Sequence, residues 1–405
     1  MNQISIATVR QNNVYAAVKE AVDYIGGIHK YVSSSTRVVI KPNYTGNLSS
    51  DSGGVTSNQV LESVIRLVKS AGVKQICILE GCGTIALGTY RIYQNLGVDK
   101  LADQYEVELL DANLLPMRTV CSEKFREMES IEIVERIFES DLLINIPVLK
   151  THPLVDITVA MKNMNGLLSP KYKRHFHDVN LRQAIVDLNM VLPKSLTIVD
   201  GLIGMEGMGP AEGMPVSMGI VMAGENVASV DATAARIMGF DPEHICYLQY
   251  AQECGIGPIK KEEIQVLGCT IESICKKFAP AEPKKVTYPG ITIYDLPTET
   301  KCVGCRAVMS IALNRICAAG DIERFAGMKV LLNGVPDEQI ELLDGEHLFC
   351  IGKCTEAYYI EHGDQSNVHY ILGCAPAGLT VEDAFRAVYN IPRRNVEMTA
   401  AIMPK

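Results

Sequence analysis

The sequence predicts an α/β fold, with a mostly parallel sheet that has helices on both faces, followed by a smaller cysteine-rich α+β C-terminal domain. Three observations indicate this fold. Strand-like apolar runs alternate with helix-like segments over residues 1–275, which is the pattern of parallel sheets with crossover helices. A segment rich in proline and lysine follows at residues 276–290. Six of the 13 cysteines lie beyond residue 300, so the last quarter of the chain differs in composition from the rest.

The first elements of the larger domain alternate strand and helix. RVVIKPN at residues 37–43 is expected to form a strand that ends in a polar loop. An amphipathic helix is expected next, because Ser57 suits an N-cap and Gly72 suits a helix end. The apolar run VKQICILEG at residues 73–81 predicts the second strand of a parallel pair.

The same alternation continues to residue 275. SDLLINIPVL at residues 140–149 and LTIVDGLIG at residues 196–204 are each expected to be one buried strand. ASVDATAARIMG is expected to be a helix that ends at Gly239. Loops that leave the carboxyl ends of such strands form the binding crevice of a parallel sheet.

A domain boundary is predicted from the segment KKFAPAEPKKVTYPG. The expected division is an α/β ligand-binding domain at residues 1–278, a linker at 279–290 and a cysteine-rich domain at 291–405. In the last part, VGCRAVMSIALNRI and TVEDAFRAVYNI are expected to be helices. KVLLNGV, HLFCIGKC and NVHYILGCAP are expected to be strands that enter loops.

Composition excludes several classes of protein. The 405 residues are 47% hydrophobic, enough for a sizeable core, and the net charge of −9 argues against nucleic acid as the main partner. No apolar run reaches the length of a membrane span. The first residues, MNQISIATVRQNN, lack the apolar core of a signal peptide, so a cytoplasmic location is expected. Cysteines in that compartment are thiols or metal ligands more often than disulfides.

The cysteines of the last quarter have the spacing of a metal site. They form the patterns Cys302-Val-Gly-Cys305, Cys350-Ile-Gly-Lys-Cys354 and Gly-Cys374-Ala-Pro. A two-residue gap lets two thiolates bind one metal centre, and four thiolates suit a 4Fe-4S cluster or a structural zinc. Five candidates are present, so one is a spare. The predicted ligands are Cys302, Cys305, Cys354 and Cys374, with Cys350 as the alternate because it directly follows a strand.

Two loops of the larger domain suggest an anion site. Lys41 and Asn43 follow the first strand, and Gly53 and Gly54 lie close behind them in SSDSGGVTS. These glycines allow backbone amides to face an anion, and the helix from Ser57 would direct its positive N-terminus toward the same place. The sequence therefore predicts a cofactor-binding or substrate-binding loop here.

The stretch PVLKTHPLVDITVAMKNMNG at residues 147–166 carries the candidate catalytic residues. Lys150 and His152 leave a buried strand, and Lys162 and Asn163 follow shortly after. Lysines neutralise carboxylate or phosphate groups, and a histidine serves as an acid–base near neutral pH. Buried lysines that lie close together repel one another unless a bound anion or an acidic side chain lies among them.

Acidic residues supply an alternative explanation for these lysines. Asp200 and Glu206 lie in VDGLIGMEGMGPAEGMP, a glycine-rich segment that is a candidate ligand clamp. These two acids, or Asp231, could instead pair internally with the lysines.

Five segments together resemble the prokaryotic family called domain of unknown function 362: VVIKPNY, SDLLINIPVLKTHPLVDITVAMKNMNGLL, RHFHD, LTIVDGLIGMEGMGPAEGMPV and ASVDATAARIMGFDPEHI. The resemblance covers about residues 35–260 and implies an association with iron–sulfur clusters. A weaker resemblance in layout is to the lactate racemase family. There, His152 and Lys162 would fall on a histidine and a lysine that tethers a nickel cofactor, although the glycine pair before that lysine is absent here.

The residues and the resemblance together favour an iron–sulfur redox protein of anaerobic metabolism. A small anionic substrate or cofactor would bind at Lys41, Lys150, His152, Lys162 and Asn163, and a C-terminal cluster would pass electrons to a partner protein. Two alternatives remain open. One is a non-redox racemase, lyase or transferase with a structural metal, and the other is an electron carrier or assembly partner without its own substrate. A homo-oligomer is compatible with each of them.

Overall fold

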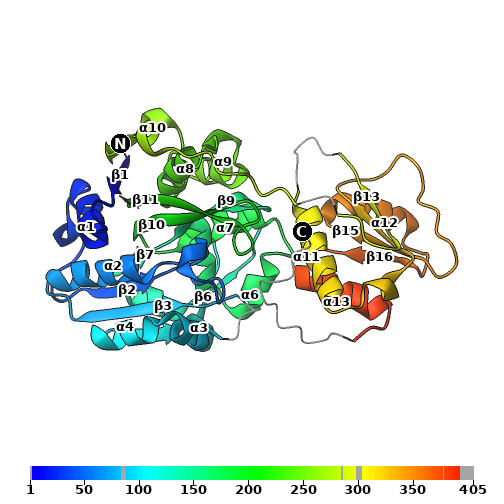
Figure 1. The fold of residues 1–405 in the computed structure, drawn as a ribbon, viewed down its shortest axis with the longest axis horizontal. Coiled ribbons are helices and arrows are strands. Elements are labelled where there is room, and N and C mark those ends of the chain that lie inside the picture. Colours follow the sequence, from blue (N-terminus) through cyan, green and yellow to red (C-terminus); the bar gives the residue numbers. More distant parts are fainter. Residues whose placement is uncertain (1, 84–87, 284–285, 298–302, 377, 393–405) are drawn as a thin grey trace. The chain divides into compact units, whose positions relative to one another are not determined.

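The computed structural model describes residues 2–83, 88–283, 286–297, 303–376 and 378–392 (Figure 1). The chain divides into two compact units. Unit 1 comprises Met1–Arg174 and Arg182–Ala281, and unit 2 comprises His175–Leu181 and Glu282–Lys405. The division at Ala281 falls within the expected linker, of which residues 284–285 lie outside the described part. Cys302, one of the predicted metal ligands, also lies outside it.

Unit 1 is built on one large sheet, with ten strands among the described residues. Its main order is β12-β1-β11-β10-β7-β2-β3-β4, and β8 pairs with β10 and β9. All pairs are parallel except those of β11 with β1 and β10 and that of β8 with β9. The mostly parallel sheet expected from the sequence is thus confirmed. The strands are β1 (Asn2–Thr8), β2 (Arg37–Lys41), β3 (Gln75–Glu80), β4 (Glu108–Asp111), β7 (Leu142–Asn145), β8 (Val148–His152), β9 (Asp156–Thr158), β10 (Ser195–Glu206), β11 (Met214–Gly224) and β12 (Ile264–Gly268).

Helices cover both faces of this sheet. Ser5 of β1 donates a hydrogen bond from its hydroxyl to the Ala21 carbonyl of α1 at 2.6 Å. Gly224, beside Ile4 in the sheet, lies against Val230 of α8. Since Ile4 and Ser5 point to opposite faces, α1 and α8 lie on opposite sides of β1. The helices are α1 (Val14–Tyr24), α2 (Asn58–Ser70), α3 (Thr89–Leu96), α4 (Val98–Gln104), α5 (Ala160–Asn163), α6 (Pro170–His175), α7 (Leu181–Val191), α8 (Val227–Ile237), α9 (Cys246–Glu253) and α10 (Ile271–Ile274).

Smaller elements complete unit 1. A hairpin of β5 (Met117–Val120) and β6 (Ile131–Val134) forms a separate antiparallel pair. Short 3-10 helices lie at Ile28–Lys30, Ser50–Ser52, Ala112–Leu114, Glu135–Glu139, Met164–Leu167, Pro242–His244 and Lys261–Glu263.

Local sequence explains the boundaries of α2. The Ser57 hydroxyl accepts a hydrogen bond from the Val60 amide at 3.3 Å, so it is the N-cap that the sequence predicts. Gly72 has φ +82°, a left-handed conformation that glycine adopts readily, and it follows the last turn.

Unit 2 is a second, smaller sheet with the order β13-β14-β15-β16, and all its pairs are parallel. Figure 1 shows its strands and helices in yellow to red. In the described residues no helix is long and apolar enough to cross a membrane. The elements are β13 (Ile291–Asp295), α11 (Gly304–Ala318), β14 (Met328–Leu332), β15 (His347–Ile351), α12 (Glu356–His362), β16 (Val368–Ile371) and α13 (Gly378–Val388), with 3-10 helices at Ile322–Phe325 and Lys353–Thr355.

Candidate functional site

Four adjacent parallel strands of unit 1 end in buried polar side chains. In sheet order these last residues are Asn145 of β7, Lys41 of β2, Glu80 of β3 and Asp111 of β4. Each is at most 5% exposed. The carboxyl ends of parallel strands meet at one edge, so the sheet itself gathers these groups where such folds bind ligands.

Lys41 forms a buried ion pair. Its ammonium Nζ lies 2.6 Å from Glu80 Oε2, and it also donates to the Pro42 carbonyl at 2.9 Å and to Asn163 Oδ1 at 3.2 Å. Burial lowers the pKa of Lys41, and the carboxylate of Glu80 opposes this effect. The charge of Lys41 is therefore balanced inside the protein.

Lys150 is equally buried but has only neutral partners. Its Nζ donates to Asn43 Oδ1 at 2.5 Å and to the Gly54 carbonyl at 2.8 Å. Burial, followed by repulsion from the Lys162 charge, lowers the pKa of Lys150 to about 7. Near neutral pH this amine therefore exists in both protonation states.

Asparagine side chains join the two lysines. Asn163 Oδ1 accepts from Asn43 Nδ2 at 2.8 Å, and Asn163 Nδ2 donates to Asn145 Oδ1 at 2.7 Å. Asn145 Nδ2 in turn donates to the Ala160 carbonyl at 3.1 Å, which anchors the start of α5. We call this network the carboxyl-edge cluster; its members are Lys41, Asn43, Glu80, Asn145, Lys150 and Asn163.

Two half-buried lysines flank the carboxyl-edge cluster. Lys162 lies in α5, and burial lowers its pKa to about 8. Lys173 lies in α6, where its Nζ donates to Asn113 Oδ1 at 2.5 Å, and burial lowers its pKa to about 8 as well. Across the part of the chain that the structure describes, no ion pair joins Lys150, Lys162 or Lys173 to a carboxylate.

Most of the predicted anion-site residues come together. Lys41, Asn43, Lys150 and Asn163 are hydrogen-bonded in one network, and the charge of Lys162 acts on Lys150. The sequence analysis missed Glu80 and Lys173. Glu80 is the last residue of the apolar run ICILE, and a charged residue at the end of a buried strand is the signal that could have identified it.

His152 has a different local environment from that expected. It is buried at the end of β8, and its Nδ1 accepts a hydrogen bond from the Leu154 amide at 3.0 Å. That bond fixes the imidazole in the turn that follows the strand. One ring nitrogen is therefore used by the backbone and is not available for acid–base work.

The acids that could have paired with the lysines bind backbone amides instead. Asp200 accepts from the Ser57 amide at 2.7 Å and the Leu202 amide at 3.1 Å, and Glu206 accepts from the Ala279 amide at 2.7 Å. The anion at the start of α2 is thus Asp200 itself. This corrects the expectation that the helix start faces a ligand, and the acid that pairs with a lysine is Glu80.

The glycine pair also has a structural use. Gly53 has φ +71°, and a Cβ there would lie 2.1 Å from the Gly204 carbonyl oxygen of β10. Only glycine allows this close approach. Gly54 contributes its carbonyl to Lys150, so the expected cradle of amides is replaced by an acceptor for an ammonium.

In unit 2, three of the predicted cysteines lie around one edge of the small sheet. Cys354 follows β15, Cys374 follows β16, and the Lys353 amide donates to the Gly373 carbonyl at 3.1 Å, which ties the two loops together. Cys305 lies in the first turn of α11, and a Cβ on Gly352 would be 2.5 Å from its Sγ. Gly352 therefore allows this thiol to lie directly against the loop that carries Cys354. Soft thiolates from separate loops suit zinc or an iron–sulfur cluster.

The described residues include no group of three or more cysteine, histidine or acidic side chains placed to hold one metal ion. The fourth predicted ligand, Cys302, is outside the described part. Cys350 lies within β15, in an apolar core that includes Leu331 and Tyr358. Burial raises the pKa of the Cys350 thiol to about 12, which disfavours the thiolate form that binds metals.

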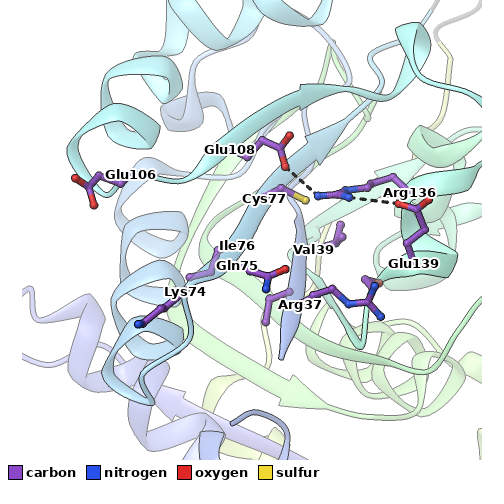
Figure 2. Close-up of a pocket in the computed structure, with 12 residues that line it drawn as sticks. Arg37, Val39, Lys74, Gln75, Ile76, Cys77, Glu106, Glu108, Arg136 and Glu139 are labelled. Atoms are coloured by element: carbon purple, nitrogen blue, oxygen red, sulfur yellow. Dashed lines mark hydrogen bonds and ion pairs between the residues drawn. The ribbon is translucent and has the colours of Figure 1, made fainter. Parts of the chain in front are cut away.

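A cavity of about 300 Å³ lies at the opposite ends of the strands, where β2 and β3 begin (Figure 2). Its guanidinium groups are already paired. Arg136 donates to Glu108 at 3.0 Å and to Glu139 at 3.3 Å, and Arg37 donates to Asp141 at 2.9 Å. This cavity is therefore separate from the carboxyl-edge cluster and has less uncompensated charge.

Residues 38–236 match the model of the family described as Domain of unknown function (DUF362). This match contains every residue of the carboxyl-edge cluster and confirms the resemblance seen in the sequence. Among curated proteins, the thylakoid-associated protein sll1697 of Synechocystis sp. is 26% identical over 258 residues, which cover 62% of this chain and 78% of that protein.

Two solved structures are similar at low sequence identity. The lactate racemase apoprotein of Thermoanaerobacterium thermosaccharolyticum is 12% identical, with a TM-score of 0.40 over 95% of this chain and 81% of that chain. A protein of Thermotoga maritima is also 12% identical, with a TM-score of 0.35 over 87% of this chain and 80% of that chain.

Proposed function

We propose that this protein is an iron–sulfur redox protein whose unit 1 binds a small anionic substrate or cofactor at the carboxyl-edge cluster. One observation carries the anion site: Lys150, Lys162 and Lys173 lack a carboxylate partner within the described residues, and the single ion pair of the cluster is used by Lys41. Buried cations at this density repel one another. A bound carboxylate or phosphate would relieve that repulsion.

The ligand's charge would be met chiefly by Lys150 and Lys162. The Lys162 ammonium has no hydrogen-bond acceptor within the described residues, and it is half-buried rather than fully solvated. An anion beside it would also lie near Lys150, whose pKa the Lys162 charge lowers. Asn43 and Asn163 would hold Lys150 and Lys41 in place, because both amides already bond to these ammonium groups.

The metal centre is proposed for Cys302, Cys305, Cys354 and Cys374. The supporting observations are the loops of neighbouring strands that carry Cys354 and Cys374, and the close approach of the Cys305 thiol to Gly352, two residues before Cys354. An iron–sulfur cluster held by four thiolates supplies one-electron transfer. Anaerobic metabolism and an electron-transfer partner follow from that chemistry as part of the proposal.

A second candidate is a non-redox racemase, lyase or transferase with a structural zinc. It is favoured by Lys150, an amine with a pKa of about 7 and only neutral partners, which suits proton transfer without electrons. An electron carrier without a substrate would leave the uncompensated lysines unexplained.

Anaerobic purification followed by metal analysis separates the two candidates. We expect about four irons per chain and visible absorbance, both lost in Cys374→Ala or Cys305→Ala but retained in Cys317→Ala, whose exposed thiol is the matched control. Stoichiometric zinc in a colourless protein would support the structural-metal candidate. Full iron content in Cys374→Ala would refute the ligand set.

The anion site is tested by binding of acetate to the full-length protein. Lys162→Met is expected to weaken binding by about 1.5–3 kcal/mol, the range for hydrogen bonds to charged groups. Lys171→Met is the control, because this exposed lysine lies in the same part of the chain. Affinity should fall as the pH rises through about 7 to 8, since Lys150 and Lys162 lose their protons there. Equal affinity in Lys162→Met would refute the site.

A further inference from the structure

The geometry points to a ligand with two separated negative groups, one bound at Lys150 and Lys162 and the other at Lys173, whose ammonium Asn113 orients. This inference rests on the proposed anion site and defines the chemical class of its ligand as a dianion, such as a dicarboxylate or a phosphorylated carboxylate. Lys173 was not among the residues that the sequence predicts for this site.

The two lysine positions lie on different sides of the Lys41–Glu80 ion pair along the sheet. Lys150 is on β8, which pairs with β10, and the partner of Lys173, Asn113, follows β4, so β2 and β3 lie between them. The charges of Lys41 and Glu80 act on both Lys150 and Lys173. Within the described part of the chain, however, no hydrogen bond joins Lys173 to the asparagine network that holds Lys150. The two lysines are therefore separate binding points along this edge of the sheet.

The residues around Lys173 hold its side chain in place, so it does not behave as a flexible surface lysine. A Cβ on Gly81 would lie 2.5 Å from Lys173 Nζ and 2.6 Å from the Gly166 carbonyl oxygen. The missing side chain at Gly81 thus allows the ammonium to approach the backbone where β3 ends. Lys173 is thereby held beside Glu80 at the same edge of the sheet.

Asn113 fixes the direction of the Lys173 ammonium. Its Nδ2 donates to the Cys82 carbonyl at 3.2 Å and to the Thr89 hydroxyl at 3.4 Å, so its Oδ1 is turned toward Lys173. An ammonium has three donors, and the structure shows one of them in use at Lys173. The remaining donors suit a second carboxylate or phosphate.

The ion pair between Lys41 and Glu80 explains why the proposed ligand has two negative groups. The negative charge of Glu80 is neutralised by Lys41, whose Nζ lies 2.6 Å from Glu80 Oε2. The lysines on either side each lack a carboxylate at ion-pair distance within the described residues. One negative group at each position would complete both, and the ligand's two groups would span the Lys41–Glu80 pair.

The experiment compares acetate with the straight-chain dicarboxylates malonate, succinate and glutarate by calorimetry on the full-length protein. We expect at least one dicarboxylate to bind about tenfold or more tightly than acetate, because a second charge-assisted contact forms. Lys173→Met should abolish this advantage and leave acetate affinity within about twofold. Lys171→Met should keep the advantage, and circular dichroism should show that both variants are folded.

The possible failures are distinguishable. If acetate binds through Lys162 but no dicarboxylate has a higher affinity, the ligand with two negative groups is refuted and the anion site is retained. If Lys173→Met weakens acetate and dicarboxylates equally, Lys173 belongs to the same subsite as Lys162, which also overturns the inference. If neither acetate nor any dicarboxylate binds, the proposed anion site itself fails.

Discussion

Gly166 shows how a single residue controls the carboxyl-edge cluster. A Cβ at this position would lie 2.0 Å from Glu80 Oε1 and 2.8 Å from Lys41 Nζ. The ion pair between those two side chains is fully buried, so neither partner can move aside into water. The lack of a side chain at Gly166 is therefore a requirement for the pair to form.

Replacing Gly166 by alanine should destabilise the protein by about 1–3 kcal/mol, the usual cost of overpacking a buried site. Gly46→Ala is the matched control, because a Cβ there would meet no atom within 4 Å. Urea unfolding of both variants measures the effect. Equal stability of the two variants would show that Glu80 can turn away without loss.

Lys150 should make stability depend on pH in a defined direction. Its pKa in the folded protein is about 7, against an ordinary value of 10.5. Between these values the unfolded chain holds a proton that the folded chain does not, so the free energy of unfolding rises with pH. Below about pH 7 the folded protein carries the full cost of the buried charge.

The difference in free energy of unfolding between the native protein and Lys150→Met should therefore shift in favour of the native protein from pH 7 to pH 9.5. Lys171→Met, a change at an exposed lysine, should show no such shift. Urea titrations at several pH values provide the measurement. A difference that is flat across this range would mean that Lys150 stays charged in the folded state.

The ends of predicted strands were the main signal by which the sequence identified site residues. Lys41 and Lys150 were found because each stands at the end of an apolar run that predicts a strand. Lys173 lies in a short helix within a run of basic residues, a pattern typical of a solvated surface. Its contact with Asn113 joins residues 60 positions apart, which no local pattern reveals.

At the scale of elements, the short helix α5 is held by a carboxylate at its start. Asp231 of α8 accepts hydrogen bonds from the Ala160 amide at 2.6 Å and the Met161 amide at 3.1 Å, and from the Tyr247 hydroxyl at 3.0 Å. Burial raises the pKa of Asp231 to about 7, while these donors oppose the shift. Helix α5 carries Lys162 and Asn163, so Asp231 positions two residues of the proposed site.

Asp231→Ala should lower the free energy of unfolding by at least about 2 kcal/mol, because buried donors lose their acceptor. It should also weaken acetate binding through the displacement of α5. Asp103→Ala, at an exposed position of α4, should change neither property. Unaltered acetate affinity in a folded Asp231→Ala variant would show that α5 keeps its position without the carboxylate.

The sequence predicts the strands β2, β3 and β10 and the helices α2 and α8 but misses one break. Residues 140–149 were expected to form one strand, and the structure has β7 and β8 separated at Ile146 and Pro147. Proline has no amide hydrogen to continue the ladder. The Ile146 amide instead donates to the Lys41 carbonyl at 2.8 Å, and the Pro147 carbonyl accepts from the Asp200 amide at 2.8 Å. Hydrophobicity alone does not reveal this change of pairing partner.

At the scale of the whole molecule, all ten described strands of the large sheet come from residues 1–281. A fragment of residues 1–281 should therefore unfold cooperatively and keep its acetate affinity. Circular dichroism and calorimetry on the fragment and on the full chain provide the comparison. A fragment without a cooperative transition would show that the two units share one core.

Residues 175–181 belong to a different unit from the residues that flank them in the sequence. They group with unit 2, and Asn180 forms a bridge with Cys374 at the loop of the proposed metal centre. Most of the chain that follows Asn180 must be synthesised before its partner Cys374 exists. During translation, unit 1 can therefore fold before Cys374, the partner of Asn180, has been synthesised. A ribosome stalled before Cys374 would therefore hold all the described strands of the large sheet without the partner of Asn180.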